Sequence, residues 1–164
     1  MEFKFQKYHG TGNDFILIND KSEKFPVDNS DRIRSLCDRK FGIGADGLIV
    51  IRNHDRFDFE MFYFNSDGKQ GSLCGNGSRC ALAYGVKSGL IKNKAVFKAI
   101  DGVHKAKANS NNIFSLSSNN VKTIEHDNNA LLLDTGSPHY VELVESLDDI
   151  NVKAKGSLIR NSDR

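Results

Sequence analysis

A strand-rich α+β fold is the class that the sequence predicts. Short segments with apolar or alternating character recur along the 164 residues, as expected for β-strands. Only two segments, 30–40 and 76–88, have the spacing or composition of helices. Hydrophobic residues form 38% of the chain and include 11 Phe, which is enough apolar material for a buried core, so overall disorder is excluded.

The predicted strands are separated by residues that favour turns. Gly, Asn, Asp and Ser gather at 65–68, 101–102 and 109–112, and Asp101-Gly102 predicts a two-residue hairpin turn. The segments that we expect to form strands are 2–8, 14–20, 47–52, 57–64, 95–100, 103–108, 112–117, 130–134 and 139–145.

Each predicted helix has a different reason to form. In the first, Ile33, Leu36 and Cys37 fall at positions i, i+3 and i+4 and place one apolar stripe on the helix. The second ends before Gly89, a residue that commonly terminates helices. A curved sheet could enclose this second helix because small residues crowd it: Ala81, Ala83 and Gly85.

Charge and cysteine content restrict the partners and the compartment. The 23 Lys and Arg and 21 Asp and Glu give a net charge of +2 and are mixed along the chain, which argues against a nucleic-acid or membrane partner. The N-terminus alternates charged and apolar residues, and the longest aliphatic run is only 48–51, so no signal peptide or membrane span is predicted. The odd number of cysteines, three, predicts reduced thiols in the cytoplasm.

The segment 73–80 is the strongest candidate for chemistry, because it places Cys74 in a glycine-rich turn that leads into the second helix. The first amides of a helix have no intrahelical acceptor and the helix dipole is positive there, which favours a thiolate on Cys74. The same turn could hold a substrate carboxylate on the amides around Gly75. Cys37 and Cys80 are predicted to be buried and unreactive, and Cys74 and Cys80 are too far apart for a zinc knuckle.

Two further loops, 9–15 and 64–68, combine glycine with Asn and Asp. Asn side chains offer donors and an acceptor, which suits an amino-acid ligand. The alternative, which the residues alone favour, is that both loops are plain hairpin turns. The segment 42–47 matches G-x-G-x-x-G, but it follows a helix and leads into a strand. The dinucleotide-binding fingerprint needs the opposite order, so we reject that interpretation.

A faint internal repeat predicts the domain organisation. Residues 11–17 align with residues 135–141, an offset of 135 − 11 = 124, although chance similarity over seven residues is the alternative. We therefore expect an N-terminal domain at 1–124 that carries Cys74, and the beginning of an incomplete second domain at 125–164.

Taken together, five motifs resemble the ordered motifs of the diaminopimelate epimerase family: 9–15, 42–47, 64–68, 74–80 and 135–139. The resemblance implies a barrel-like mixed sheet around a central helix, normally in two similar domains with the active site between them. It also implies an isomerase that interconverts LL- and meso-diaminopimelate in lysine and peptidoglycan precursor biosynthesis. Members use neither pyridoxal phosphate nor a metal, and two cysteines transfer protons on opposite faces of one carbon.

The resemblance assigns roles to particular residues. Cys74 matches one catalytic thiol. His139 matches a histidine near the catalytic thiols, and the two interpretations are assistance to thiol ionisation and a purely structural imidazole. The residues that match substrate-binding positions are Asn13, Asn65, Gly75, Asn76 and Ser137.

This chain departs from the family pattern in three ways. Ser137 stands where members commonly have Asn, and Gly47 where some have Gln, so two substrate contacts are weakened or absent. The second thiol would lie after residue 164, so we expect little or no epimerase activity from this chain alone. A homodimer or a separate C-terminal half are the expected partners besides diaminopimelate.

Other functions stay open at this point. The chain could be a racemase of another amino or imino acid, or a non-catalytic module that binds an amino acid. A cysteine hydrolase would need a histidine placed against Cys74 as a general base, for which the spacing gives no evidence.

Overall fold

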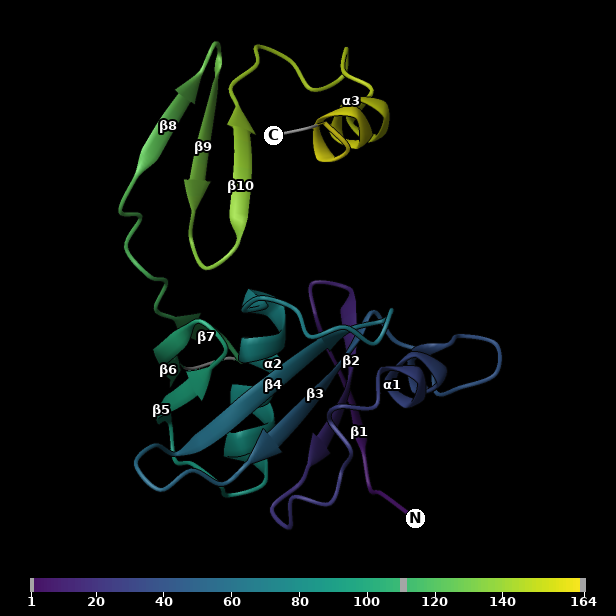
Figure 1. The fold of residues 1–164 in the computed structure, drawn as a ribbon. Helices are drawn as coiled ribbons and strands as arrows, with labels where there is room; N and C mark the ends of the chain where they lie inside the picture. The colour runs from purple at the N-terminus through teal and green to yellow at the C-terminus, as the bar shows by residue number, and fades with distance from the viewer. Residues whose placement is uncertain (1, 110–111, 163–164) are drawn as a thin grey trace. The chain divides into compact units, whose positions relative to one another are not determined.

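The computed structural model describes residues 2–109 and 112–162, and these fall into two compact units that divide between Asn119 and Asn120 (Figure 1). Part of the turn predicted at 109–112 lies outside the described residues. Among the described helices, none combines the length and apolar character that a membrane crossing requires.

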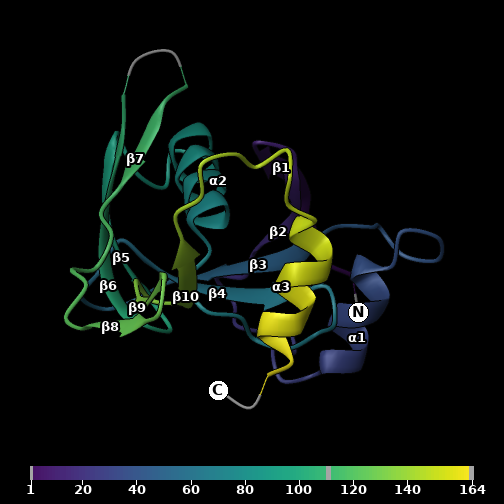
Figure 2. The same ribbon diagram turned by 90° about the horizontal axis from the view of Figure 1, so that it is seen from above.

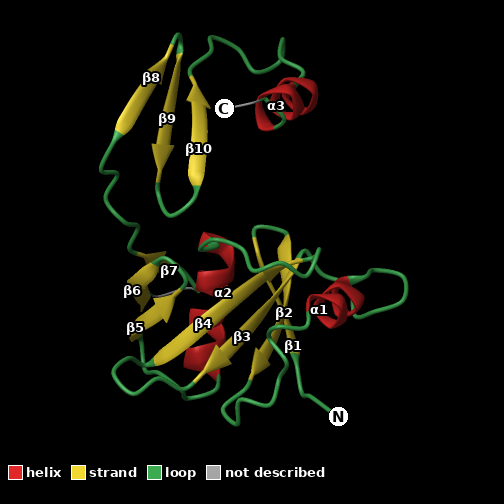
Figure 3. Cartoon of the chain, in the orientation of Figure 1, coloured by secondary structure: helices red, strands yellow, loops and turns green. Residues whose placement is uncertain are grey.

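A seven-stranded mixed sheet forms the first unit, with the strands in the order in which they occur in the chain (Figure 3). Neighbours β2 and β3, and β4 and β5, are parallel, and the other pairs are antiparallel. The strands are β1 (Gln6–Gly10), β2 (Asn13–Asn19), β3 (Gly47–Arg52), β4 (Phe59–Asn65), β5 (Lys94–Ala99), β6 (Gly102–Ala108) and β7 (Phe114–Leu116).

Helix α2 (Gly75–Lys87) packs inside the curl of this sheet. Figure 2 shows it between β1 on one side and β5 to β7 on the other. Strands β3 and β4, which lie between these in the sheet, also contact the helix. Ala81 and Leu82 on this helix are fully buried, and Gly89 follows the C-cap with a φ of +72°. The predicted mixed sheet around a central helix is therefore confirmed.

Helix α1 (Ser30–Cys37) covers the other face of the sheet, so the central strands are buried on both sides. Phe15 of β2 packs in the cluster around α2, while its neighbour Ile16 packs in the cluster that contains Ile33 of α1. Cys37 is 3% exposed in that second cluster, as its position on the helical stripe predicted.

The structure corrects several local predictions. Helix α1 ends at Cys37 rather than residue 40, and strand β10 ends at Glu142 rather than residue 145. The first strand begins at Gln6 rather than residue 2. The hairpin between β5 and β6 turns at Ile100 and Asp101, because Ala99 pairs directly with Gly102. Gly102, with a φ of +128°, is thus the first residue of β6 rather than a turn residue.

The second unit contains an antiparallel sheet in the order β10-β9-β8 and one helix. Its elements are β8 (Ile124–Asp127), β9 (Ala130–Asp134), β10 (Pro138–Glu142) and α3 (Val152–Arg160). Strand β8 and helix α3 were not predicted, although the Asn151 side chain, which accepts from Ala154 N and caps α3, is a recognisable sequence signal. The aligned segments 11–17 and 135–141 both run from a hairpin loop into a strand, and the proposed duplication stays a prediction.

Candidate active site

The polar residues of three motifs meet at one end of the large sheet. Strand pairing places Phe15 opposite Gly47, and Gly47 opposite Asn65. Asn13, which begins β2, and Asp46, which precedes β3, therefore lie at the same end as Asn65. Loops that are far apart in the sequence are brought together by the register of the sheet.

Cys74 is the N-cap residue of α2 and joins this group. Its Sγ accepts a hydrogen bond from Gly77 N at 3.3 Å and lies 3.9 Å from Asn13 Oδ1. Gly77 N belongs to the first turn of α2, where backbone N–H groups have no acceptor within the helix. In the described part of the first unit, Cys74 has no hydrogen bond to a histidine, so this unit gives no support to the cysteine hydrolase alternative.

The amides of Gly75 and Asn76 open the first turn of α2, where a helix has no acceptor of its own for them. A Cβ added to Gly75 would meet no atom closer than Arg79 Nη1 at 3.7 Å, so packing does not require a glycine there. A Cβ added to Gly77 would lie 3.1 Å from Ile49 Cδ1, so that glycine lets the helix approach β3 closely. The bare backbone at Gly75 leaves room for an anion beside the thiol.

Asn13 and Asn76 are held by specific side-chain partners. Asn13 Nδ2 donates to Asp46 Oδ2 at 2.9 Å, and Asn76 Nδ2 donates to Asn13 Oδ1 at 3.3 Å. Asn76 Oδ1 accepts from the Arg79 guanidinium. Two of the three predicted substrate-binding asparagines, Asn13 and Asn76, therefore contact each other beside Cys74.

Asn65 is oriented by a tyrosine that the sequence motifs did not single out. Tyr63 Oη donates to Asn65 Oδ1 at 2.8 Å, which turns the Asn65 amide nitrogen away from the tyrosine. Burial raises the pKa of Tyr63 to about 12, so its hydroxyl stays a donor at neutral pH. The ring of Tyr63 fills the space where a Cβ at Gly47 would stand, 2.7 Å from Cε2. The glycine at position 47 is the sequence feature that fits this packing, because it has no side chain to collide with the Tyr63 ring.

A compact ionic cluster supports the same loops. Arg39 Nη2 contacts Asp14 Oδ1 at 2.7 Å and Asp46 Oδ1 at 2.9 Å, and Lys7 Nζ contacts Asp14 Oδ2 at 2.7 Å. The hydrogen bond from Arg39 holds the pKa of Asp14 far below its usual range. The pKa of Asp46 is also lowered, chiefly by the hydrogen bond from Asn13. Both carboxylates are therefore ionised at neutral pH.

The other two cysteines are buried. Cys37 and Cys80 are each 3% exposed in separate apolar clusters, and burial raises the pKa of each thiol to about 11. Both are therefore protonated at neutral pH, as their predicted burial implies.

Ser137 and His139 lie in the second unit. His139 is exposed, and its Nδ1 is 2.6 Å from the Ser137 backbone oxygen and 3.5 Å from Thr135 Oγ1. These contacts are local to the loop between β9 and β10. The roles predicted for Ser137 and His139 toward substrate and thiol stay predictions.

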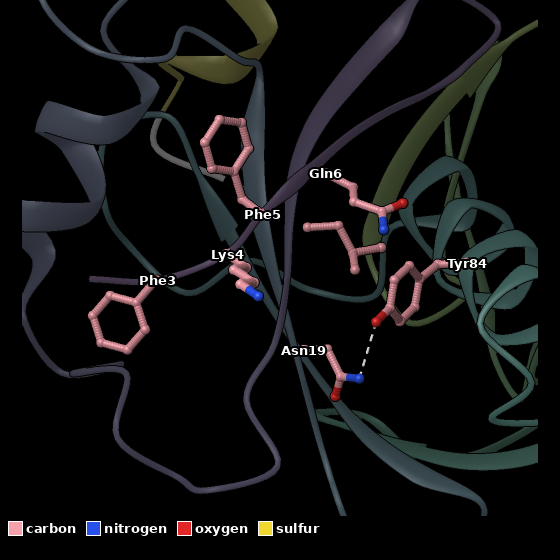
Figure 4. Close-up of a pocket in the computed structure, with 7 residues that line it drawn as sticks. Phe3, Lys4, Phe5, Gln6, Asn19 and Tyr84 are labelled. Carbon is pink, nitrogen blue, oxygen red and sulfur yellow. Dashed lines mark hydrogen bonds between the residues drawn. The ribbon is translucent and has the colours of Figure 1, made fainter. Parts of the chain in front are cut away.

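A hollow of about 600 Å³ lies beside β1, apart from the residues above (Figure 4). Asn19 Nδ2 donates to Tyr84 Oη at 2.9 Å on its wall. The lining residues are Phe3, Lys4, Phe5, Gln6, Leu17, Asn19 and Tyr84, none of which is a predicted site residue.

Residues 5–124 match the family described as diaminopimelate epimerase. The chain is 50% identical over 160 residues to the diaminopimelate epimerase of Flavobacterium psychrophilum, covering 98% of this chain and 62% of the relative. It is 37% identical over 175 residues to the Aquifex aeolicus protein of the same name, covering 96% of this chain and 63% of that protein. This chain belongs to the diaminopimelate epimerase family.

The chain spans less than two thirds of the length of these relatives. The part matched to the family contains Asn13, Asn65 and Cys74, and so includes the whole group at the end of the large sheet.

Solved structures support the fold. A phenazine biosynthesis protein of the PhzF family from Bacillus anthracis superposes with a TM-score of 0.64 at 14% identity, covering 89% of this chain and 56% of that protein. A probable proline racemase from Agrobacterium radiobacter gives a TM-score of 0.63 at 13% identity, with coverage of 98% and 61%. At such low identity these two structures carry the fold and not the activity.

Proposed function

We propose that this chain supplies one of the two thiols with which a diaminopimelate epimerase inverts the α-carbon of diaminopimelate, without pyridoxal phosphate or a metal. The observation that carries the proposal is the position of Cys74. It caps α2, accepts from Gly77 N at 3.3 Å, and adjoins the open first turn at Gly75. Membership of the family and the names of its relatives support the choice of substrate.

The proposed reaction uses Cys74 as the base on one face of the substrate. The thiolate takes the α-proton and becomes a thiol, and the electron pair of the broken C–H bond moves onto the α-carbon and its carboxylate. The amides of Gly75 and Asn76 would hold that carboxylate and stabilise the added charge. A thiol on the opposite face then gives its proton to the carbon, and the configuration is inverted.

Two side-chain amides add to the substrate contacts proposed for the backbone amides of Gly75 and Asn76. Asn13 begins β2 and Asn65 ends β4, and their side-chain amides are oriented by Asp46 and Tyr63. Each can offer hydrogen bonds to the ammonium and carboxylate groups of an amino acid. Cys37 and Cys80 are buried, so Cys74 is the thiol in the described residues that can meet a substrate.

Deuterium exchange tests the proposal on the 164-residue chain. LL-diaminopimelate is incubated with the chain in D₂O, and α-deuteration and stereochemistry are followed by NMR and chiral chromatography. We expect binding, and at most deuteration without inversion, because one thiol serves one face. Cys74→Ser should abolish deuteration, and Gly75→Ala should weaken binding without unfolding the chain.

Two results would contradict the proposal. Deuteration that persists in Cys74→Ser would remove this thiol from the chemistry, and inversion by the wild-type chain at ordinary enzyme rates would show that a second thiol is not needed. A panel of other amino and imino acids separates the related racemase. Exchange on proline but not on diaminopimelate would favour that alternative.

A further inference from the structure

Two amide side chains beside Cys74 form a hydrogen-bonded chain between a carboxylate and a guanidinium. Asp46 Oδ2 accepts from Asn13 Nδ2 at 2.9 Å, Asn13 Oδ1 accepts from Asn76 Nδ2 at 3.3 Å, and Asn76 Oδ1 accepts from Arg79. Every link therefore joins a donor to an acceptor, and all of the links run in the same direction.

The two ends determine that direction. An ionised carboxylate can only accept hydrogen bonds and a guanidinium can only donate them. Asp46 therefore requires the NH₂ group of Asn13, and Arg79 requires the oxygen of Asn76. Reversing either amide would bring two oxygens or two N–H groups face to face. The lowered pKa of Asp46 keeps its end ionised across the neutral range.

This direction decides which atom Asn13 presents to Cys74. With its NH₂ group on Asp46, Asn13 turns Oδ1 toward the thiol, 3.9 Å from Sγ, where it accepts from S–H. On the helix side, Gly77 N donates to the same sulfur at 3.3 Å. The sulfur therefore has an acceptor for its protonated form and a donor for its ionised form.

We propose that Asp46 is a positioning residue that holds the Asn13 oxygen on the S–H of Cys74 and so limits the fraction of thiolate at neutral pH. An acceptor that bonds only the protonated form opposes ionisation. This inference rests on the proposed function, because a thiol that alternately removes and returns a proton needs a hydrogen-bond acceptor when it is protonated and a donor when it is ionised. Asp46 itself does not contact Cys74 through a hydrogen bond; it acts through Asn13.

Alkylation of the free chain tests the proposal without any substrate. Iodoacetamide labelling is followed across pH by mass spectrometry of tryptic peptides. Cys74 is the only thiol in the peptide of residues 70–79, and Cys37 and Cys80 fall in other peptides. The midpoint of the pH profile reports thiolate formation, whereas a change in access to the sulfur alters only the plateau rate.

Removing the acceptor should move the Cys74 profile to lower pH. In Asn13→Ala we expect about three- to tenfold faster labelling below the midpoint, since one weak hydrogen bond to the thiol is lost. Asp46→Asn should shift the profile in the same direction, by less, and should add nothing in the Asn13→Ala background. Asp14→Asn is the matched control, because it removes one charge from the same ionic cluster and keeps the Asn13–Asp46 hydrogen bond.

Three outcomes would overturn the proposal: a shift to higher pH in Asn13→Ala, an equal shift in Asp46→Asn and Asp14→Asn, or an effect of Asp46→Asn that survives the loss of Asn13. Thermal unfolding checks that each variant is folded, and if Asp46→Asn does not fold, the sign of the Asn13→Ala shift decides. Failure of the proposed function would appear instead in the deuterium-exchange experiment, which this labelling does not use.

Discussion

Alkaline pH should destabilise the first unit through Cys37, a buried thiol of α1. Its side chain is 3% exposed, and burial raises its pKa from 9.0 to about 11. Between these values the unfolded chain loses the proton while the folded chain keeps it. The folded state then binds more protons than the unfolded state, so stability falls as pH rises from about 9 to about 11 and is constant below that range.

The size of the effect follows from the shift in pKa. A difference of two units corresponds to about 2 to 3 kcal/mol of unfolding free energy at 1.36 kcal/mol per unit. Cys37→Ala removes this loss, at the cost of about 1 kcal/mol at neutral pH for the smaller side chain. The variant should therefore begin less stable than wild type and become at least as stable near pH 11.

Urea unfolding under reducing conditions measures both curves, and only their difference is interpreted, because other groups that titrate are common to the two proteins. Ile33→Val is the matched control. It loses a methylene from the same cluster without a titratable group, and should stay parallel to wild type. A gap between wild type and Cys37→Ala that does not change from pH 8 to pH 11 would refute the reasoning.

Three further substitutions test the packing of the site and the sheet. Tyr63→Phe removes the donor to Asn65 Oδ1 and should weaken diaminopimelate binding by about 1 kcal/mol, measured by calorimetry, with little change in the urea midpoint. Gly47→Ala should destabilise the chain by about 2 to 3 kcal/mol in urea, because the new Cβ would lie 2.6 Å from a carbonyl oxygen of β4. Arg52→Met should cost about 3 to 5 kcal/mol, because it leaves the carboxylate of Asp20, whose side chain is 2% exposed, without its cation.

Each of these variants has a matched comparison. Tyr63→Phe is also measured in an Asn65→Ala background, where it should weaken binding no further if the tyrosine acts through Asn65. Gly75→Ala should leave the urea midpoint nearly unchanged, since its Cβ would meet nothing closer than 3.7 Å. Lys98→Met breaks a more exposed pair with Glu60 and should cost less than about 1 kcal/mol. If Gly75→Ala destabilised the chain as much as Gly47→Ala, crowding of the new Cβ would not explain the loss at Gly47. If Lys98→Met cost as much as Arg52→Met, burial of the ion pair would not explain the loss at Arg52.

Features that depend on neighbouring residues could be predicted from the sequence. The i, i+3, i+4 spacing predicted helix α1 and the burial of Cys37, and the glycine-rich turn predicted that a helix begins after Cys74. Capping, periodicity and turn preference act over a few residues, which is why these predictions succeeded. The turn at Ile100 and Asp101 was missed because the register of β5 with β6 decides which residues form a hairpin loop.

Contacts in the site between residues that are far apart in the sequence could not be predicted. Asp46 meets Asn13 across 33 residues of sequence, and Cys74 meets Asn13 across 61. Tyr63 was missed because its hydrogen bond to Asn65 depends on which face of β4 carries its ring. It also depends on the absence of a side chain at Gly47, where the ring packs. No local pattern contains this information.

The sequence by itself determined most elements of the first unit, the reactive thiol candidate and the family, because these depend on short motifs and on side-chain chemistry that is present in any conformation. Only the tertiary structure decided that Asp46 and Arg79 orient the amides beside Cys74, and that Tyr63 orients Asn65. The physical reason is that hydrogen bonds act over about 3 Å, and such distances between remote residues exist only once the strands have paired in one register.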